Sequence, residues 1–341
     1  MAARRGDTLL FPTPPVVAAH AAIGGKKEGE GPLAACFDAL SADNFFGQSS
    51  WEAAEKELAL QTARLCIKKA QTTPEKVSLV LAGDLQAQCT ASSYAMRELG
   101  IPFAGLFGAC STMAEALGLG AALCSAGMAD GLLAMTSSHF CAAERQFRTP
   151  LSYGAVRTPT AQWTATAAGA CLLRPAGEGV QLCAVTFGRV QDYKIKDINN
   201  MGAAMAPAAA ATLLHYLKDT GSAPEDFDRI YTGDLGHVGS QLLRDLLAAE
   251  GLLLKNHVDC GCILYDATEQ TVKSGGSGPG CSASVLCGHI LPRLERGTQK
   301  RALFIATGAL MSQTTFLQKE SIPAIAHLVE LRSPQQKEEN G

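Results

Sequence analysis

The chain has 341 residues, of which 47% are hydrophobic and 18% charged, and its formal net charge is −3. This composition excludes a disordered chain and is typical of a globular protein with a large core. The length suffices for one large α/β unit or for two domains of ordinary size. The charge balance, with no dense basic run, argues against a protein that binds nucleic acid.

Twelve cysteines lie scattered in apolar surroundings, and residues 1–10 lack the apolar run of a signal peptide. We therefore expect a cytoplasmic-type soluble chain with free thiols. Cys260 and Cys262 are separated by one residue, which is shorter than a usual zinc pair, so we expect no metal. No stretch reaches the roughly 20 apolar residues that span a bilayer, and any membrane role is expected to be peripheral.

Apolar runs and helical periodicity predict alternating strands and helices along the chain. Ser49 and Glu52 have the spacing of a capping box at the start of the first long helix. This alternation predicts mostly parallel sheets covered by helices, while both chain ends are expected to be frayed. We expect strands at residues 16–23, 77–81, 132–136, 181–187, 229–232 and 302–307, helices at 52–70, 208–217 and 241–250, and frayed ends at 1–13 and 333–341.

Residues 105–126 (GLFGACSTMAEALGLGAALCSA) are the most informative stretch. A turn at Gly108 presents Cys110, and small residues then follow at helical spacing, which predicts a helix in a crowded interior. The unpaired N–H groups at a helix N-terminus favour negative charge, either a thiolate at Cys110 or a bound carboxylate. The alternative is a buried apolar cysteine.

An internal repeat divides the chain. Residues 74–85 (PEKVSLVLAGDL) resemble residues 224–235 (PEDFDRIYTGDL) at an offset of 150. The string around Cys110 (GACS) is echoed around Cys281 (PGCS), and each of these cysteines precedes a threonine, Thr136 or Thr307, by 26 residues. Three matched landmarks in the same order predict two similar α/β halves.

Two α/β halves with a cysteine at the start of a buried helix in the first half resemble the thiolase fold of thiolases and ketoacyl synthases. The resemblance implies an α/β protein with five layers, αβαβα, whose halves we place at residues 1–180 and 181–333, followed by a disordered tail at 334–341. It also implies a homodimer that pairs through the first halves, with residues 89–96 and 103–107 as candidate contacts.

Longer strings narrow this resemblance to the family of stage V sporulation protein AD. The similarity covers about residues 15–331 and includes GEGP (29–32), GACSTMA (108–114), SSHFCAAERQF (137–147), PTAQW (159–163), NNMGAAMAPA (199–208), TGDLGHVGS (232–240), GGSGPGCSA (275–283) and ESIPAIAH (320–327). It implies a protein of endospore formers that binds dipicolinic acid (pyridine-2,6-dicarboxylate), with or without calcium, and supports its uptake into the developing spore. Implied partners are other stage V sporulation membrane proteins at the spore inner membrane, and no cofactor is implied.

A condensing enzyme needs a cysteine thiolate and positioned donors that stabilise an oxyanion. In ketoacyl synthases a histidine and an asparagine from the second half take part. In the string that aligns with the histidine motif of these enzymes, Asp234 stands in place of the histidine and His237 in place of an asparagine. A separate segment, residues 278–284, aligns with the asparagine motif, and it contains Pro279, which cannot donate a hydrogen bond. We therefore expect a protein that is not an enzyme.

Binding of a small dianion needs fewer positioned groups than acyl transfer does. The planar arginine side chain is suited to binding a carboxylate through two hydrogen bonds. Arg145 and Arg148 lie three residues apart and close to His139 in the sequence. The plainer interpretation of the two arginines is a solvated helix face or a pairing with Glu144, and that of His139 is a hydrogen-bonded core histidine. Trp163 and Met205 are candidate apolar walls, or else plain core residues. The full set of candidate ligand residues is Cys110, His139, Arg145, Arg148, Trp163, Met205, Asp234, His237, Gly276 and Ser277.

Two other functions stay open from the sequence. A β-ketoacyl synthase or acyltransferase that uses Cys110 as its nucleophile predicts a thioester on that residue. A structural scaffold of a spore membrane complex predicts that surface substitutions, and not pocket substitutions, abolish assembly.

Overall fold

A mixed 13-stranded sheet forms the frame of the protein in the computed structural model, which describes residues 2–147 and 156–334. The main path of hydrogen-bonded strands is β12-β11-β14-β15-β10-β3-β9-β7-β5-β6. Its first half consists of β3 (Val16–Gly24), β5 (Leu79–Gly83), β6 (Phe103–Gly105), β7 (Leu132–Ser138) and β9 (Ala167–Arg174). Its second half consists of β10 (Val180–Thr186), β11 (Arg229–Thr232), β12 (His257–Asp259), β14 (Arg301–Ala309) and β15 (Ala324–Arg332).

The two halves of the sheet have the same topology. The first half runs β3-β9-β7-β5-β6 and the second runs β10-β15-β14-β11-β12, so corresponding strands occupy corresponding places. This agreement confirms the internal duplication that the repeated strings predict. The division near residue 180 stays a prediction, and the tail at 334–341 falls almost wholly outside the described residues.

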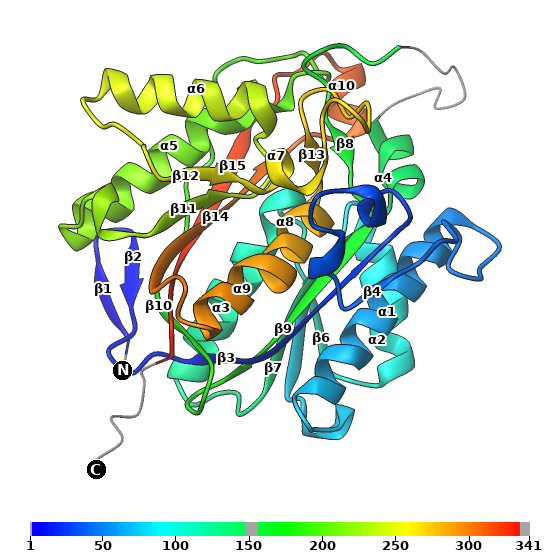
Figure 1. The fold of residues 1–341 in the computed structure, drawn as a ribbon, viewed down its shortest axis with the longest axis vertical. Helices are drawn as coiled ribbons and strands as arrows, with labels where there is room; N and C mark the ends of the chain where they lie inside the picture. The colour runs from blue at the N-terminus through cyan, green and yellow to red at the C-terminus, as the bar shows by residue number, and fades with distance from the viewer. Residues whose placement is uncertain (1, 148–155, 335–341) are drawn as a thin grey trace.

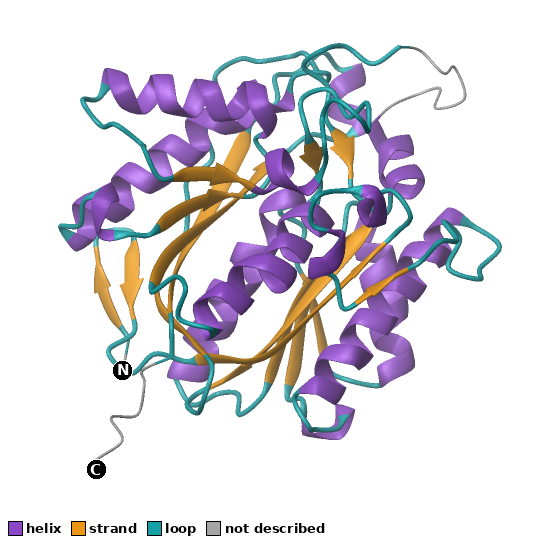
Figure 2. Cartoon of the chain, in the orientation of Figure 1, coloured by secondary structure: helices purple, strands orange, loops and turns teal. Residues whose placement is uncertain are grey.

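Helices form three layers around the two half-sheets (Figure 1). One pair covers the first half and another pair covers the second, while a third group lies between them, and this gives the expected αβαβα order (Figure 2). These helices are α1 (Trp51–Lys69) with α2 (Thr90–Leu99), α5 (Met201–Thr220) with α6 (Gly236–Ala249), and, between the half-sheets, α3 (Thr112–Ser125), α8 (Pro279–Val285) and α9 (Leu291–Glu295). The largest apolar core surrounds this central layer.

The remaining elements are short. They are β1 (Ala3–Arg5), β2 (Thr8–Leu10), β4 (Ala39–Leu40), α4 (Phe140–Phe147), β8 (Trp163–Thr164), α7 (Cys260–Leu264), β13 (Gly276–Ser277) and α10 (Gln313–Leu317). No helix of the described ranges combines the length and the apolar character needed to cross a membrane.

The small residues of α3 are explained by how closely it packs in the central layer. A Cβ atom added to Gly118 would lie 2.5 Å from Cγ2 of Val185, and one added to Gly120 would lie 2.7 Å from Cδ1 of Leu173. Larger side chains there would push the helix off the sheet.

The expectation of mostly parallel sheets is wrong. β9 is antiparallel to β3 and β7, and β15 is antiparallel to β10 and β14. The segment that joins β14 to β15 contains only the short α10, so the chain turns back beside its own strand without a crossover.

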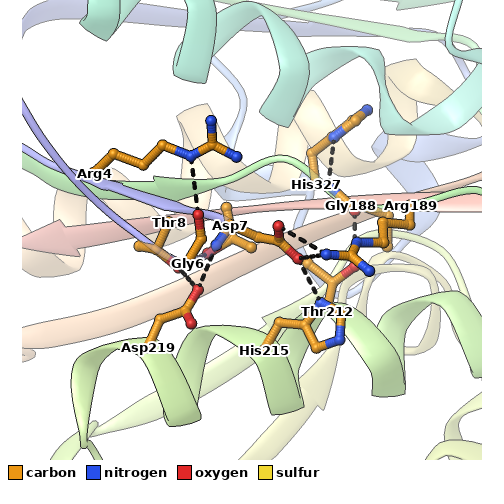
Figure 3. Close-up of polar contacts among 12 residues, drawn as sticks. Arg4, Gly6, Asp7, Thr8, Gly188, Arg189, Thr212, His215, Asp219 and His327 are labelled. Atoms are coloured by element: carbon orange, nitrogen blue, oxygen red, sulfur yellow. Dashed lines mark hydrogen bonds and ion pairs between the residues drawn. The ribbon is translucent and has the colours of Figure 1, made fainter.

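The N-terminal segment is not frayed, because β1 and β2 form a hairpin fastened to the second half (Figure 3). The backbone N–H of Asp7 donates to Oδ2 of Asp219 at 2.8 Å, and the Thr8 hydroxyl donates to the same oxygen at 2.9 Å. The Asp7 carboxylate in turn pairs with Arg189 at 2.8 Å and lies 3.0 Å from Nδ1 of His215.

The start of α1 also differs from the prediction by one residue. Ser50, and not Ser49, caps this helix by accepting a hydrogen bond from the Ala53 N–H at 3.3 Å.

Candidate functional site

Cys110 lies in a tight turn immediately before α3, as the sequence predicts, with one turn of 3-10 helix (Ala109–Ser111) in between. Ala109 holds a left-handed conformation (φ 53°), and Cys110 is only 9% exposed. Gly308 on β14 passes directly beside this turn, where an added Cβ would lie 2.4 Å from the carbonyl oxygen of Gly108. Only glycine therefore fits opposite the turn.

The side chain of Asp234 lies beside Cys110 and is buried. It follows β11, and its carboxylate accepts hydrogen bonds from the Ser277 hydroxyl (2.9 Å), the Gly278 N–H (3.0 Å) and the Thr307 hydroxyl (2.8 Å). The Cys110 thiol lies close enough to this carboxylate to feel its charge. We call Cys110, Asp234, Ser277, Gly278 and Thr307 the elbow cluster.

The elbow cluster keeps the thiol protonated. Burial is the main cause that raises the pKa of Cys110 well above its usual range, and the negative charge of Asp234 raises it further. Burial also raises the pKa of Asp234, against the lowering effect of its donors. Of the interpretations that the sequence left open for Cys110, the thiolate is therefore disfavoured, because desolvation and a neighbouring carboxylate act against the helix N–H groups.

Little space adjoins the elbow cluster among the described residues. A crevice that ends at Ser277 and is walled by Thr164, Gln162 and Asn199 has a volume of about 20 Å³. That volume is enough for about one water molecule.

A larger cavity of about 280 Å³ opens on the other side of β8. Its walls come from the loop after β3, the segment before α1, the junction of β7 with α4, and β8. We call it the aromatic cavity, and it is lined by Lys26, Lys27, Glu28, Glu30, Asn44, Trp51, His139, Phe140, Cys141, Trp163 and Thr166.

Flat rings form much of its wall. Phe140 and Trp163 are stacked, with ring centroids 4.0 Å apart and an interplanar angle of 19°. The Trp51 ring lies 5.3 Å from that of His139 and is itself stacked on Phe45 at 3.8 Å. Stacked and offset rings of this kind offer a surface for another planar group.

Cations surround these rings, and sequence reasoning missed all of them. Nζ of Lys27 lies 4.5 Å from the Trp163 ring centroid and donates to the Gln270 carbonyl at 2.8 Å. The Arg157 guanidinium lies 4.8 Å from the same centroid and pairs with Glu144 at 2.6 Å. Lys26 is exposed at the cavity. The available signal was position, since both lysines directly follow the first strand at its carboxyl end, where α/β sheets gather ligands.

Two buried polar side chains of the aromatic cavity keep atoms without a hydrogen-bond partner among the described residues. They are Nδ1 of His139 and Oε2 of Glu28. The other nitrogen of His139, Nε2, donates to the Asn44 carbonyl at 2.8 Å, and burial lowers the pKa of the ring. Oε1 of Glu28 accepts from the Thr166 N–H at 3.0 Å and from the Tyr265 hydroxyl, and burial raises the pKa of this carboxyl.

The other candidate residues lie apart from the aromatic cavity. Arg145 is exposed and pairs with Glu52, not with Glu144. Met205 is a core residue of the second half. His237 is exposed, and its backbone N–H donates to the Ser274 carbonyl at 2.7 Å. Arg148 lies outside the described residues.

The structure thus gathers part of the candidate set into two neighbouring groups, with Cys110, Asp234 and Ser277 in the elbow cluster and His139 and Trp163 at the aromatic cavity. A short parallel ladder joins them, because Trp163 of β8 is in register with Gly276 of β13, and Thr164 with Ser277. The Trp163 N–H donates to the Gly275 carbonyl at 2.8 Å, and the Ala165 N–H donates to the Ser277 carbonyl at 2.9 Å.

Comparison with known proteins gives one family and one fold. The sequence model of the family described as stage V sporulation protein AD matches residues 5–332. Stage V sporulation protein AD of Bacillus subtilis (strain 168) is 41% identical over 322 residues, which cover 94% of this chain and 95% of that protein.

Solved structures with a similar fold include proteins of low sequence identity. Cerulenin-bound OleA of Xanthomonas campestris has a TM-score of 0.62 at 15% identity and covers 97% of this chain and 99% of its own. The 3-oxoacyl-[acyl-carrier-protein] synthase III of Aquifex aeolicus VF5 has a TM-score of 0.57 at 12% identity, with coverage of 93% and 99%. These likenesses confirm the predicted thiolase-like fold.

Proposed function

The chain belongs to the stage V sporulation protein AD family, and we propose that it is a non-catalytic thiolase-fold protein that binds dipicolinate and supports its uptake into the developing spore. The observation that carries the proposal is the aromatic cavity, which combines stacked rings with lysine side chains. The family resemblance supplies the identity of the ligand. We also propose, on family grounds, a peripheral location at the spore inner membrane beside other stage V sporulation membrane proteins.

The aromatic cavity suits a flat dianion for two reasons. Phe140 and Trp163 are already stacked on each other, so a ligand would stack on an outer face of this pair and not between the two rings. A planar heteroaromatic ring suits such a face. Lys26 and Lys27 supply positive charge at the same cavity, and the charge of the half-buried Lys27 is screened less than at an open surface.

The elbow cluster supports the absence of catalysis. A nucleophilic cysteine needs a base or a lowered pKa, whereas Cys110 has a carboxylate neighbour and a raised pKa. The adjoining crevice of about 20 Å³ is also far smaller than an acyl chain with its carrier arm.

Titration of the purified protein with dipicolinate by isothermal calorimetry tests the proposal. We expect saturable binding that isophthalate, the same dianion without the ring nitrogen, competes for more weakly. Trp163→Ala and the double variant Lys26→Ala/Lys27→Ala should each weaken binding at least tenfold. Lys194→Ala, which removes an exposed lysine paired with Asp192, is the matched control and should bind normally. Absence of saturable binding to the wild-type protein would refute the proposal.

We further propose that a second copy of the chain pairs with the first half. β6 ends the sheet path, and Tyr94 and Phe107 beside it are 52% and 59% exposed. An open strand edge with exposed aromatic residues is suited to pairing with another strand edge. Sedimentation equilibrium should give a dimer, and Phe107→Asp should give a monomer, with Met128→Asp, also at an exposed apolar residue, as the control.

A further inference from the structure

The imidazole of His139 at the aromatic cavity is buried and only half satisfied in its hydrogen bonds. It is 1% exposed, and it follows β7 at the point where α4 begins. Nε2 faces a backbone carbonyl, that of Asn44, which can only accept a hydrogen bond, so this nitrogen carries the hydrogen. In the neutral ring Nδ1 is therefore a bare acceptor, and it has no donor among the described residues.

A dipicolinate dianion also offers only acceptors, namely its carboxylate oxygens and its ring nitrogen. A bare Nδ1 beside such a ligand would set one lone pair against another, with neither satisfied. Protonation of Nδ1 turns this repulsion into a charge-assisted hydrogen bond and adds a positive charge next to a dianion.

Resting on the proposed function, we propose that the dianion enters the aromatic cavity together with one proton from solvent, which is taken up by Nδ1 of His139. The step converts a neutral imidazole into an imidazolium and breaks no other bond. The ligand stays a dianion and the protein gains one positive charge.

The surrounding charges favour uptake only when the ligand is present. In the empty cavity, burial lowers the pKa of His139, and only the Asn44 carbonyl and the charge of Glu52 on α1 act in the opposite direction. The ring is therefore neutral at pH 7 before the ligand arrives. The other titratable groups that share the cavity are Lys26, Lys27, Glu28, Glu30 and Cys141.

The lysines oppose a further cation, and the bound dianion removes that opposition. Glu28 is the competing proton site, because its Oε2 is also buried and unpartnered. Burial raises the pKa of this carboxyl, so any proton it carries is already present in the empty protein and is not counted as uptake.

Calorimetric titration of the full chain with dipicolinate at pH 7.5, in buffers of different ionisation enthalpy such as phosphate and Tris, measures the number of protons taken up. We expect close to one proton for the wild-type protein. Across the pH range between the pKa values of the free and bound ring, the affinity should fall by up to about tenfold per pH unit as pH rises.

His139→Gln keeps an amide donor for the Asn44 carbonyl and removes the titrating ring, so its uptake should fall to near zero while weaker binding remains. Glu28→Gln tests the competing proton site, and one proton per bound ligand should still be taken up, whatever the change in affinity; Lys194→Ala, outside the cavity, is the matched control. Saturable binding to the wild-type protein without proton uptake overturns this inference and leaves the proposed function intact. Uptake that survives in His139→Gln but is lost in Glu28→Gln assigns the proton to Glu28 and also overturns it.

Absence of binding overturns the proposed function and this inference together. Ring nitrogen chemical shifts of the wild-type protein labelled with ¹⁵N-histidine provide a readout that needs no variant. One of its seven histidines should change from a neutral to a doubly protonated ring when dipicolinate is added at constant pH.

Discussion

The buried carboxylate of Asp234 lies beside the thiol of Cys110, where a nucleophilic cysteine would need a base. Both groups are withdrawn from solvent. The arrangement preserves the turn that presents the cysteine while it disfavours the thiolate.

Incubation with acetyl-CoA should therefore leave the protein unmodified. The raised pKa of Cys110 keeps the thiolate fraction negligible near neutral pH, and no acyl transfer to sulfur is expected. Mass spectrometry of the intact chain measures this directly. An acetyl adduct that appears on the wild-type protein and disappears in Cys110→Ala would instead support the acyltransferase alternative.

Thr307→Val should destabilise the protein by about 1–3 kcal/mol, because it removes one donor from the buried Asp234 carboxylate without changing the shape of the side chain. Equilibrium urea unfolding measures this difference. The matched control is Thr314→Val on α10, an exposed position that should change the free energy of unfolding by less than about 0.5 kcal/mol. Equal effects at both positions would contradict the role given to Thr307.

Gly308→Ala should lower the stability of the fold, although it adds only one methyl group. The added methyl carbon would lie 2.4 Å from the Gly108 carbonyl oxygen, which is backbone and cannot rotate away. We expect a loss of about 1–3 kcal/mol in the free energy of unfolding. Thermal unfolding followed by circular dichroism checks it, and an unchanged midpoint would show that the turn before α3 tolerates displacement.

The N-terminal hairpin should loosen in acid. The hydrogen bond from Arg189 is the main cause that lowers the pKa of Asp7, so this carboxylate stabilises the folded hairpin above its unfolded pKa of about 3.9. That contribution is lost as pH falls from there through the lower folded value. Amide hydrogen exchange in β1 and β2 should accelerate over this acidic range.

At neutral pH, Asp7→Asn should produce the same acceleration, because the neutral amide pairs poorly with Arg189 and His215. Asp192→Asn alters another carboxylate of lowered pKa, which lies in a separate loop, and serves as the control. Hairpin exchange that is insensitive to Asp7→Asn would mean that the bonds to Asp219 hold the hairpin without help from the ion pair.

Much of the architecture could be predicted because the two halves carry similar turn and helix-start residues at corresponding positions. Pro74 and Pro224 each begin a short turn before a buried strand, and Cys110 and Cys281 each begin a buried helix. Two of the long strands were not recognised. Residues 167–173 are uniformly apolar, and residues 324–332 are buried almost throughout, so neither shows the alternation that marks a half-exposed strand.

The candidate site was predicted in part for a physical reason. Asp234 was selected because the resemblance aligns it with a histidine of the ketoacyl synthases, and the structure places it beside Cys110. Lys26 and Lys27 were not selected, since nothing local shows that their loop folds onto Trp163, far along the chain. Tertiary packing, and not propensity, decides such neighbours.

The ladder between β8 and β13 connects the aromatic cavity with the surroundings of the Cys110 thiol. Trp163 cannot shift along its strand without moving Gly276, and the next pair in that register carries the Ser277 hydroxyl that supports Asp234. An occupant that displaces the indole therefore changes the surroundings of a thiol it never touches. Substitutions at this wall of the cavity are consequently expected to alter the turn that carries Cys110 as well.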